Sequence, residues 1–157
     1  MNKKTYSSIK NGRNVHYVDI ENICGSANLT AEMVARARDE YFAKVNPGKD
    51  DLYYVTSSHH NMQAVCFGWP GARVGFRSGK DGGDILLAQE IVYEHPETLF
   101  KGVYVASGDH GLSPFVDHLI QIDLPVTIVS GKRQLSYDMS HVGAPVIFLE
   151  SDFSLAA

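Results

Sequence analysis

The stretch VYVASGD, residues 103–109, decides which fold the sequence predicts. It is a short apolar run of β-branched and aromatic residues that stops at a Ser-Gly-Asp turn. This pattern is typical of a buried strand that carries a carboxylate, Asp109, to the edge of a sheet. A second such run, residues 15–18, leads into Asp19, and a third acid, Asp84, opens an apolar helical stretch between them. A site at the sheet edge requires that these three carboxylates meet.

Strand-like and helix-like segments alternate along the rest of the chain. We expect strands at residues 15–19, 52–56, 72–77, 103–106, 125–129 and 146–149. We expect helices at residues 28–45, around 62–66, at 84–93 and at 114–120, while 130–142 are ambiguous between a loop and a short helix. This alternation predicts right-handed βαβ units. The expected fold class is α/β: a single-domain, three-layer α/β/α sandwich with a mainly parallel central sheet.

Length and composition are those of one ordinary globular domain. The chain has 157 residues, of which 44% are hydrophobic and 20% charged. The polar, basic residues 1–12 lack the apolar core of a secretory signal, so we expect a flexible tail followed by a domain over 13–157. The apolar runs are strand-sized, and we expect no membrane partner. Cys24 and Cys66 form no zinc or disulfide pattern, which favours the cytoplasm.

The net charge of −4 is mild. It argues against a protein that coats nucleic acid by charge alone, because such binding depends on many lysine and arginine contacts to phosphates. It is compatible with an enzyme that gathers acids at one metal site and places basic residues around the rim.

The three acids are expected at one edge, because function in an open parallel sheet collects beyond the carboxyl ends of the strands. Carboxylates that converge there raise one another's pKa, and a divalent cation relieves the repulsion. Oxygen ligands select Mg²⁺ or Mn²⁺, which suits attack of a metal-activated water on a phosphodiester. The alternative for Asp19, Asp84 or Asp109 taken singly is a helix cap or turn residue.

Three motifs occur in order along this pattern: DIEN at residues 19–22, GGDILL at 82–87, and SGD at 107–109 followed by PFV at 114–116. Over roughly residues 14–130 they resemble the motifs of NYN domains, a branch of the PIN-like nuclease superfamily. The resemblance implies a metal-dependent ribonuclease that acts on single-stranded or structured RNA. It implies that Asp19, Asp84 and Asp109 bind the metal. It also implies that Asn22 and Ser107 shape the site or contact the substrate phosphate.

The sequence departs from this family at one position. Many members carry a second acid two residues after the Ser-Gly-Asp aspartate, and this chain has Gly111 there. The metal cage is then weaker, or Asp81 supplies the missing charge, or the domain binds RNA without cutting it. Glu21 is a further acid whose direction the sequence does not fix.

Basic residues near the motifs are candidates for substrate contacts. We expect Arg77 and Lys80, in and after the third strand, to bind RNA phosphates, and His110 to orient a water or a phosphate. The alternative for each is a solvated surface residue.

Two rival functions remain open at the level of the sequence. One is a catalytically silent RNA-binding or protein-interaction module, favoured by Gly111 and the acidic balance. The other is a phosphatase or phospho-acceptor domain, for which Lys132 is the only candidate lysine. The apolar residues 148–155 are expected either to close the sheet or to form a homodimer interface.

Overall fold

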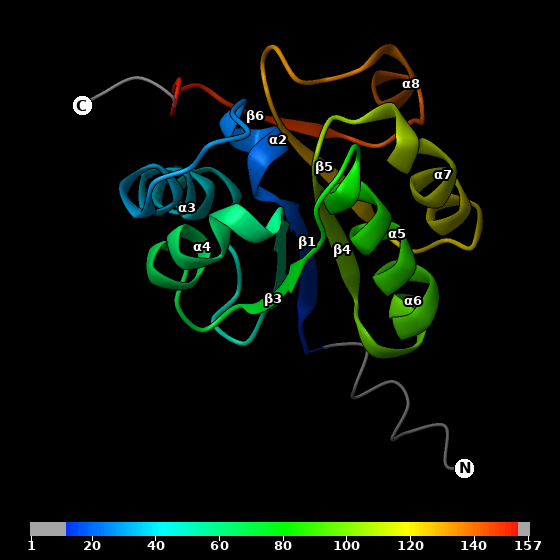
Figure 1. Ribbon diagram of the computed structural model, residues 1–157. Coiled ribbons are helices and arrows are strands. Elements are labelled where there is room, and N and C mark those ends of the chain that lie inside the picture. The colour runs from blue at the N-terminus through cyan, green and yellow to red at the C-terminus, as the bar shows by residue number, and fades with distance from the viewer. Residues whose placement is uncertain (1–11, 154–157) are drawn as a thin grey trace.

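The computed structural model describes residues 12–153, which build a six-stranded sheet with every strand parallel to its neighbours (Figure 1). The strands lie in the order β3-β2-β1-β4-β5-β6. Their bounds are β1 Asn14–Asp19, β2 Leu52–Ser57, β3 Arg73–Phe76, β4 Gly102–Ala106, β5 Val126–Gly131 and β6 Val146–Leu149. All six predicted strands are present, each within two residues of its expected bounds.

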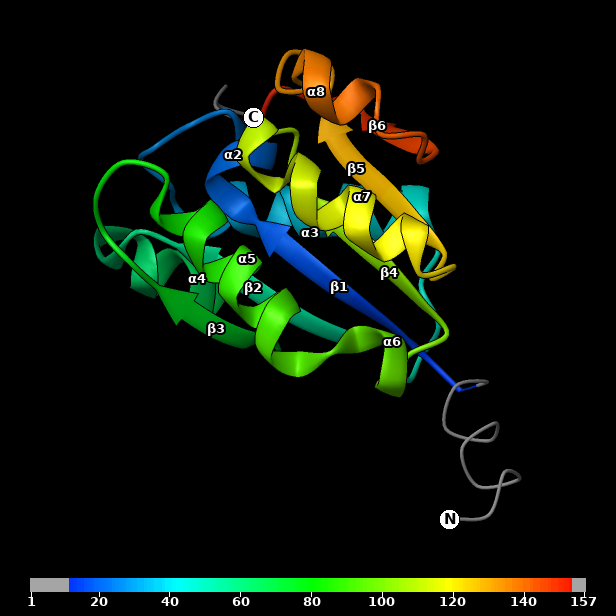
Figure 2. The same ribbon diagram turned by 90° about the vertical axis from the view of Figure 1, so that its right-hand side faces the viewer.

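Helices cover both faces of this sheet (Figures 1 and 2). Helices α3 and α4 pack on one face, whereas α5, α6, α7 and α8 pack on the other. The helix bounds are α2 Ile20–Cys24, α3 Ala31–Val45, α4 Met62–Gly68, α5 Gly82–Glu94, α6 Pro96–Leu99, α7 Ser113–Gln121 and α8 Tyr137–Ser140, with short 3₁₀ turns η1 His59–Asn61 and η2 His110–Leu112. The predicted single-domain, three-layer α/β/α class is confirmed, and the sheet is entirely parallel.

Two apolar cores lie on the two faces of the sheet because successive side chains of a strand point to opposite sides. In β1, Tyr17 points into the core with Leu87 of α5, and Val18 points into the core with Tyr41 of α3. All four side chains are fully buried. Burial on both faces explains why the strands read as nearly continuous apolar runs.

Strand β1 lies at the centre, where the chain changes direction across the sheet. From β1 the chain moves to β2 on one side, and later returns to β4 on the other side. The register pairs Asp19 with Thr56 of β2, and Val18 with Ala106 of β4. The carboxyl ends of the three strands therefore lie side by side at a topological switch point, which is where ligands bind in open α/β sheets.

Helix ends follow the capping chemistry of the sequence. The Thr30 hydroxyl accepts the Met33 N–H at 3.1 Å and caps the start of α3. Helix α2 was not predicted: it is a single short turn that begins directly after β1, with Asp19 as its cap, and ends at Gly25 in the left-handed conformation. The ambiguous stretch 130–142 contains the short helix α8.

A polar network is buried near the amino end of β1. The His16 ring lies between Tyr53 and Tyr104, with ring centroids 4.6 and 4.5 Å away. Its Nε2 lies 2.8 Å from an Asp51 carboxylate oxygen, and its Nδ1 lies 2.6 Å from the Tyr41 hydroxyl. Burial lowers the pKa of His16, and the carboxylate of Asp51 opposes that shift. His16 is therefore a fully buried core histidine with both ring nitrogens hydrogen-bonded.

The end of the described chain closes the sheet. Strand β6 is one of the two edges of the sheet, and Leu149 and Phe153 are buried against the core beside α3. A homodimer interface over 148–155 stays a prediction, and 154–155 lie outside the described residues. The expected flexible tail over 1–12 also falls outside them, apart from Gly12. Between residues 12 and 153, no helix is both long and apolar enough to cross a membrane.

Candidate metal centre

Asp19 stands at the carboxyl end of β1 and is almost fully buried, with 7% of its surface exposed. One carboxylate oxygen accepts the N–H of Asn22 at 3.2 Å and caps α2. The amino end of α5 approaches so closely that a Cβ at Gly83 would lie 3.0 Å from this carboxylate. The glycine pair before Asp84 therefore has a steric reason: a side chain at the second glycine would push the helix away from Asp19.

Asp84 lies in the first turn of α5 and is also only 7% exposed. It is hydrogen-bonded to Asp19, and the Ser107 hydroxyl donates to one of its oxygens at 3.4 Å. The Thr56 hydroxyl at the end of β2 donates to the carbonyl of Gly83 at 3.2 Å. This bond fixes the amino end of α5 over β1, and so places Asp84 beside Asp19.

Asp109 follows β4 and begins η2. Its carboxylate accepts the N–H of Gly111 at 2.7 Å, and its own N–H donates to the Ser107 hydroxyl at 3.2 Å. The side chain is 23% exposed, which makes Asp109 the most accessible of the three acids named by the motifs. Ser107, fully buried, thus contacts both Asp84 and Asp109 and holds their two turns together.

Asn22 joins the turns after β1 and β4. Its side-chain oxygen accepts the N–H of Gly108 at 2.9 Å across a separation of 86 residues. On its other side Gly108 packs against the loop after β5, where an added Cβ would overlap the carbonyl of Gln134. The Ser136 N–H also donates to the Gly108 carbonyl at 2.8 Å. The turn that presents Asp109 is therefore held from two sides.

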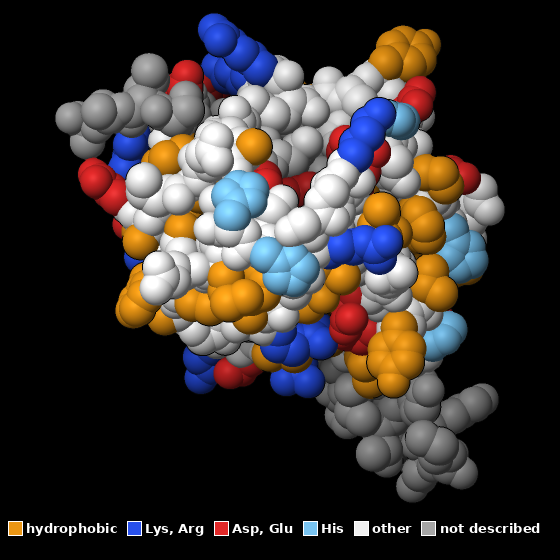
Figure 3. Space-filling view, in the orientation of Figure 1, with side chains coloured by type: hydrophobic (Ala, Val, Ile, Leu, Met, Phe, Trp, Pro, Cys, Tyr) orange, Lys and Arg blue, Asp and Glu red, His pale blue; other side chains and the backbone are white. Residues whose placement is uncertain are grey.

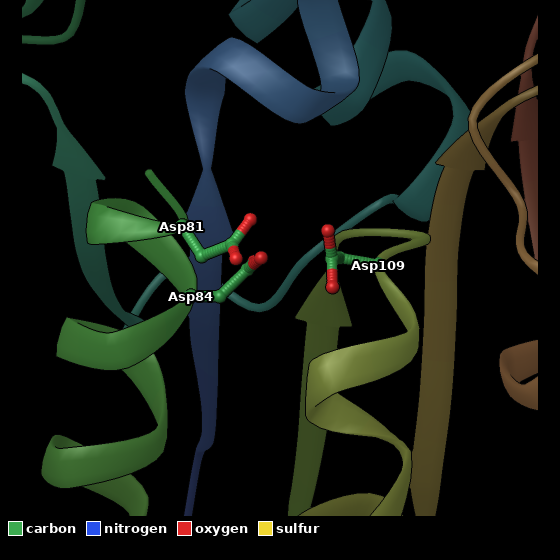
Figure 4. Close-up of side chains that lie close together, drawn as sticks. All are labelled: Asp81, Asp84 and Asp109. Carbon is green, nitrogen blue, oxygen red and sulfur yellow. The ribbon is translucent and has the colours of Figure 1, made fainter. Parts of the chain in front are cut away.

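Asp81 joins the acidic group from the loop before α5. It is exposed, and its backbone is left-handed, with φ of 59°. One oxygen each from Asp81, Asp84 and Asp109 lie within 4.8 Å of one another. Figure 4 shows the carboxylates of Asp81 and Asp84 pointing across a gap towards Asp109. Asp19 lies behind this group, in contact with Asp84.

After small side-chain rotations, the three oxygens could hold a single divalent cation. Magnesium binds oxygen at about 2.1 Å, so two oxygens on one ion are at most about 4.2 Å apart. Rotations that move each oxygen by less than about 1 Å would bring Asp81, Asp84 and Asp109 within this limit. An all-oxygen donor set is the one that Mg²⁺ and Mn²⁺ prefer.

The electrostatics of the cluster favour the binding of a proton or a cation by its carboxylates. Burial raises the pKa of Asp19 to about 6, although hydrogen bonds from Asp84 and the Asn22 N–H act in the opposite direction. Burial, followed by the charge of Asp19 and hydrogen bonds with Asp19 and Asp109, raises the pKa of Asp84 to about 9. Near neutral pH, Asp84 therefore carries a proton when no cation is bound. A divalent cation would replace that proton, since it needs ionised ligands.

The remaining predicted residues lie around the acids. His110 is mostly exposed, with its Nδ1 at 3.6 Å from an Asp109 oxygen. Arg77 and Lys80 are exposed on the loop between β3 and α5 and do not join the cluster. Glu21 points elsewhere, because the Ser58 N–H and hydroxyl donate to its two oxygens. In Figure 3 acidic side chains lie recessed in a hollow, with Lys, Arg and His side chains around it.

A groove leads away from the acids along α5. It has a volume of about 1110 Å³, and Asp81, Asp84 and Asp109 line one end of it. Sequence reasoning missed this groove, as well as the supporting roles of Thr56, Gly83 and Gly108. The double glycine before Asp84 was the available signal for a close approach, whereas nothing in the pattern marked Thr56.

No protein-family model matches the chain, and no curated protein matches it. Among solved structures, the chain is similar to the crystal structure of a protein of unknown function, VPA0982, from Vibrio parahaemolyticus RIMD 2210633. The two share 17% sequence identity with a TM-score of 0.57, over 90% of this chain and 95% of that chain. The likeness extends over nearly the whole domain and shows a common α/β fold.

Proposed function

We propose that the protein is a divalent-metal-dependent ribonuclease that uses Mg²⁺ or Mn²⁺. The observation that carries this proposal is the convergence of Asp81, Asp84 and Asp109 at the switch point of a parallel sheet. The resemblance of the motifs around Asp19, Asp84 and Asp109 to those of NYN domains supports it. Asp81, which approaches from the loop, offsets the absence of an acid at Gly111.

Each acid has a distinct place in this proposal. Asp84 and Asp109 hold the ion directly, and Asp81 joins them from solvent. Asp19, hydrogen-bonded to Asp84, completes the set and orients that carboxylate. The Ser107 hydroxyl keeps the Asp84 and Asp109 turns at a fixed separation. A bound ion supplies a water of lowered pKa and neutralises charge that develops on the attacked phosphate.

The charges around the site favour a nucleic acid as the substrate and argue against a phospho-acceptor function. Among the described residues, neither Arg77 nor Lys80 has an acid within 4.0 Å, so both are free to contact phosphates. Lys132, which a phospho-acceptor site would need next to the acids, pairs instead with Glu150 at 2.5 Å. The proposed substrate is therefore RNA, as the motif resemblance implies.

The test is cleavage of labelled RNA and DNA with Mn²⁺ and with a chelator. We expect the wild-type protein to cut RNA when Mn²⁺ is present and not to cut it in chelator. Asp109→Asn should lose more than about 100-fold of the rate, because changing even a neighbour of a metal ligand costs about 10- to 100-fold. Asp50→Asn, an exposed acid at the opposite end of the sheet, is the matched control and should cut normally. Full activity in Asp109→Asn would refute the assignment.

Gly111 favours a second candidate, a silent RNA-binding module. It stands where many NYN domains carry an acid, so the remaining acids have to suffice for metal binding. If the module is silent, Mn²⁺ will not raise the melting temperature, and RNA will bind uncut with or without metal. A metal-dependent rise in wild type that Asp84→Asn abolishes would exclude this candidate.

A further inference from the structure

The groove beside the acids lies between α5 and the segment formed by η2 and α7. These elements lie side by side on the same face of the sheet (Figures 1 and 2). From α5 the groove is lined by Ile85, Ala88 and Val92, which lie three and four residues apart and so share one helix face, and from α7 by Phe115. Tyr93, at its far end, is 85% exposed. The groove is therefore an apolar and aromatic surface that begins at the candidate metal centre.

The charge of the groove limits what it can hold. Its charged lining consists of Asp81, Asp84, Asp109 and Glu90. Two histidines are the only lining side chains that can become positive, and Glu90 already pairs with Arg73 at 3.1 Å. A phosphate is repelled along this surface, whereas a neutral planar group is not. Phosphates of a bound strand therefore have to stay at the metal end or on the rim.

Gly111 keeps the groove open towards the acids. It lines the groove next to Asp109, and an added Cβ would lie 3.2 Å from an oxygen of that carboxylate. A longer side chain would stand at the junction between the acids and the apolar walls. The glycine that removes an acid from the cluster thus also leaves room for a ligand to continue from the cluster into the groove.

We infer that this groove binds an unpaired nucleobase of the RNA, next to the phosphate held at the acids. The inference rests on the proposed function and adds a substrate subsite to it. Small-molecule sites usually measure about 300–1000 Å³, so a groove of about 1110 Å³ accommodates a nucleoside. Tyr93 and Phe115 offer aromatic surface, and the exposed amide of Gln89 offers a donor and an acceptor for the base edge. A paired base would first have to break its pairing and stacking to enter, and an unpaired base avoids most of that cost, so single-stranded RNA is favoured.

The test uses single-stranded RNAs that each lack one base, with the backbone intact. Affinities are measured by fluorescence anisotropy on Asp19→Asn, since Asp19 does not line the groove and its loss slows cleavage during the measurement. Loss of a stacked base typically weakens binding by about 5- to 100-fold. We expect a penalty of this size at one position only, and less than about twofold elsewhere.

Substitutions in the groove test whether the loss of affinity caused by the missing base arises there. Ala88→Phe, which fills the groove, should weaken the binding of intact RNA by about the same factor. In this variant the missing base should cause no further loss of affinity, because both changes remove the same interaction. Tyr93→Ala, at an exposed position, keeps the test valid if Ala88→Phe does not fold, and should weaken binding less. Phe67→Ala removes an aromatic side chain that is 76% exposed on the opposite face, and should bind as the parent does.

Several results would overturn the inference, and one would overturn the proposed nuclease activity alone. Equal penalties at all positions, or an unchanged affinity in Ala88→Phe, would mean that no base enters the groove. A molecular mass that rises with protein concentration in the parent, but not in Ala88→Phe, would identify a second copy of the chain as the occupant. If the RNA is cut but no single missing base weakens its binding, the subsite is refuted and the nuclease assignment stands. RNA that shows the penalty but is never cut refutes the nuclease and leaves the subsite intact.

Discussion

Replacing the buried acid Asp84 by asparagine should make the metal-free protein more stable. Asp84 is 7% exposed and borders Asp19 and Asp109, and this environment raises its pKa to about 9. The native protein therefore binds a proton at this side chain near neutral pH, whereas the unfolded chain leaves it ionised. The contribution of Asp84 to the unfolding free energy of wild type falls as pH rises from about 4 towards the native pKa, because this side chain binds more protons in the native state over that range. Asparagine has nearly the same shape and needs no proton.

The magnitude follows from the cost of protonation. An unfolded aspartate has a pKa of about 3.9, and each pH unit above it corresponds to about 1.36 kcal/mol. Holding Asp84 neutral at pH 7 therefore costs up to about 4 kcal/mol, and at pH 5 about 1.5 kcal/mol. Asp84→Asn should recover most of these amounts. For a chain of this size, 1 kcal/mol corresponds to about 2–4 °C, so the melting temperature should rise by roughly 10 °C at pH 7.

The assay is urea and thermal unfolding of both proteins in chelator, at pH 5 and pH 7. The gain in unfolding free energy should be larger at pH 7, and added Mn²⁺ should stabilise wild type but not the variant. Asp81→Asn is the control, because this exposed side chain should change stability by less than about 0.5 kcal/mol at either pH. If Asp84→Asn destabilises the protein, or its effect is the same at both pH values, the three carboxylates do not repel one another as the structure indicates.

Three further changes test the support of the site and the core. Asn22→Ala should weaken Mn²⁺ binding by about 10- to 100-fold in calorimetry, because the Gly108 N–H loses its acceptor. Gly108→Ala should lower the unfolding free energy by about 1–3 kcal/mol in urea, since its Cβ overlaps the carbonyl of Gln134. Asp51→Ala should lower it by about 1–3 kcal/mol, because the buried ring of His16 loses its hydrogen-bond partner.

The sequence contained enough information to predict the fold and to bring three acids to one edge. Apolar runs that end at Asp19 and Asp109 mark buried strands, and strands joined by helices have to run parallel, so their carboxyl ends meet. Helix α2 was missed because five residues give no measurable helical period. The sequence predicts its cap, Asp19, only as the end of a strand, which it also is.

The supporting bonds of the site could not be predicted in the same way. The Thr56 hydroxyl contacts the carbonyl of Gly83 across 27 residues, and Asn22 contacts Gly108 across 86. Each pair joins two turns whose approach depends on how the whole sheet twists and packs. A pattern of apolar residues predicts which face of the sheet a side chain lies on. It does not predict which turn lies within hydrogen-bond distance of that side chain.

Capping and metal binding were alternatives for each acid in the sequence, but in the structure they are compatible. Asp19 accepts the Asn22 N–H, and Asp109 accepts the Gly111 N–H, each with a single oxygen. A carboxylate has a second oxygen and further lone pairs, so capping leaves it able to bind a cation. Capping also fixes the rotamer, which lowers the cost of ordering the ligand when the ion binds. A helix cap at the end of a central strand is therefore a pre-oriented ligand, provided that a second such strand end lies within reach.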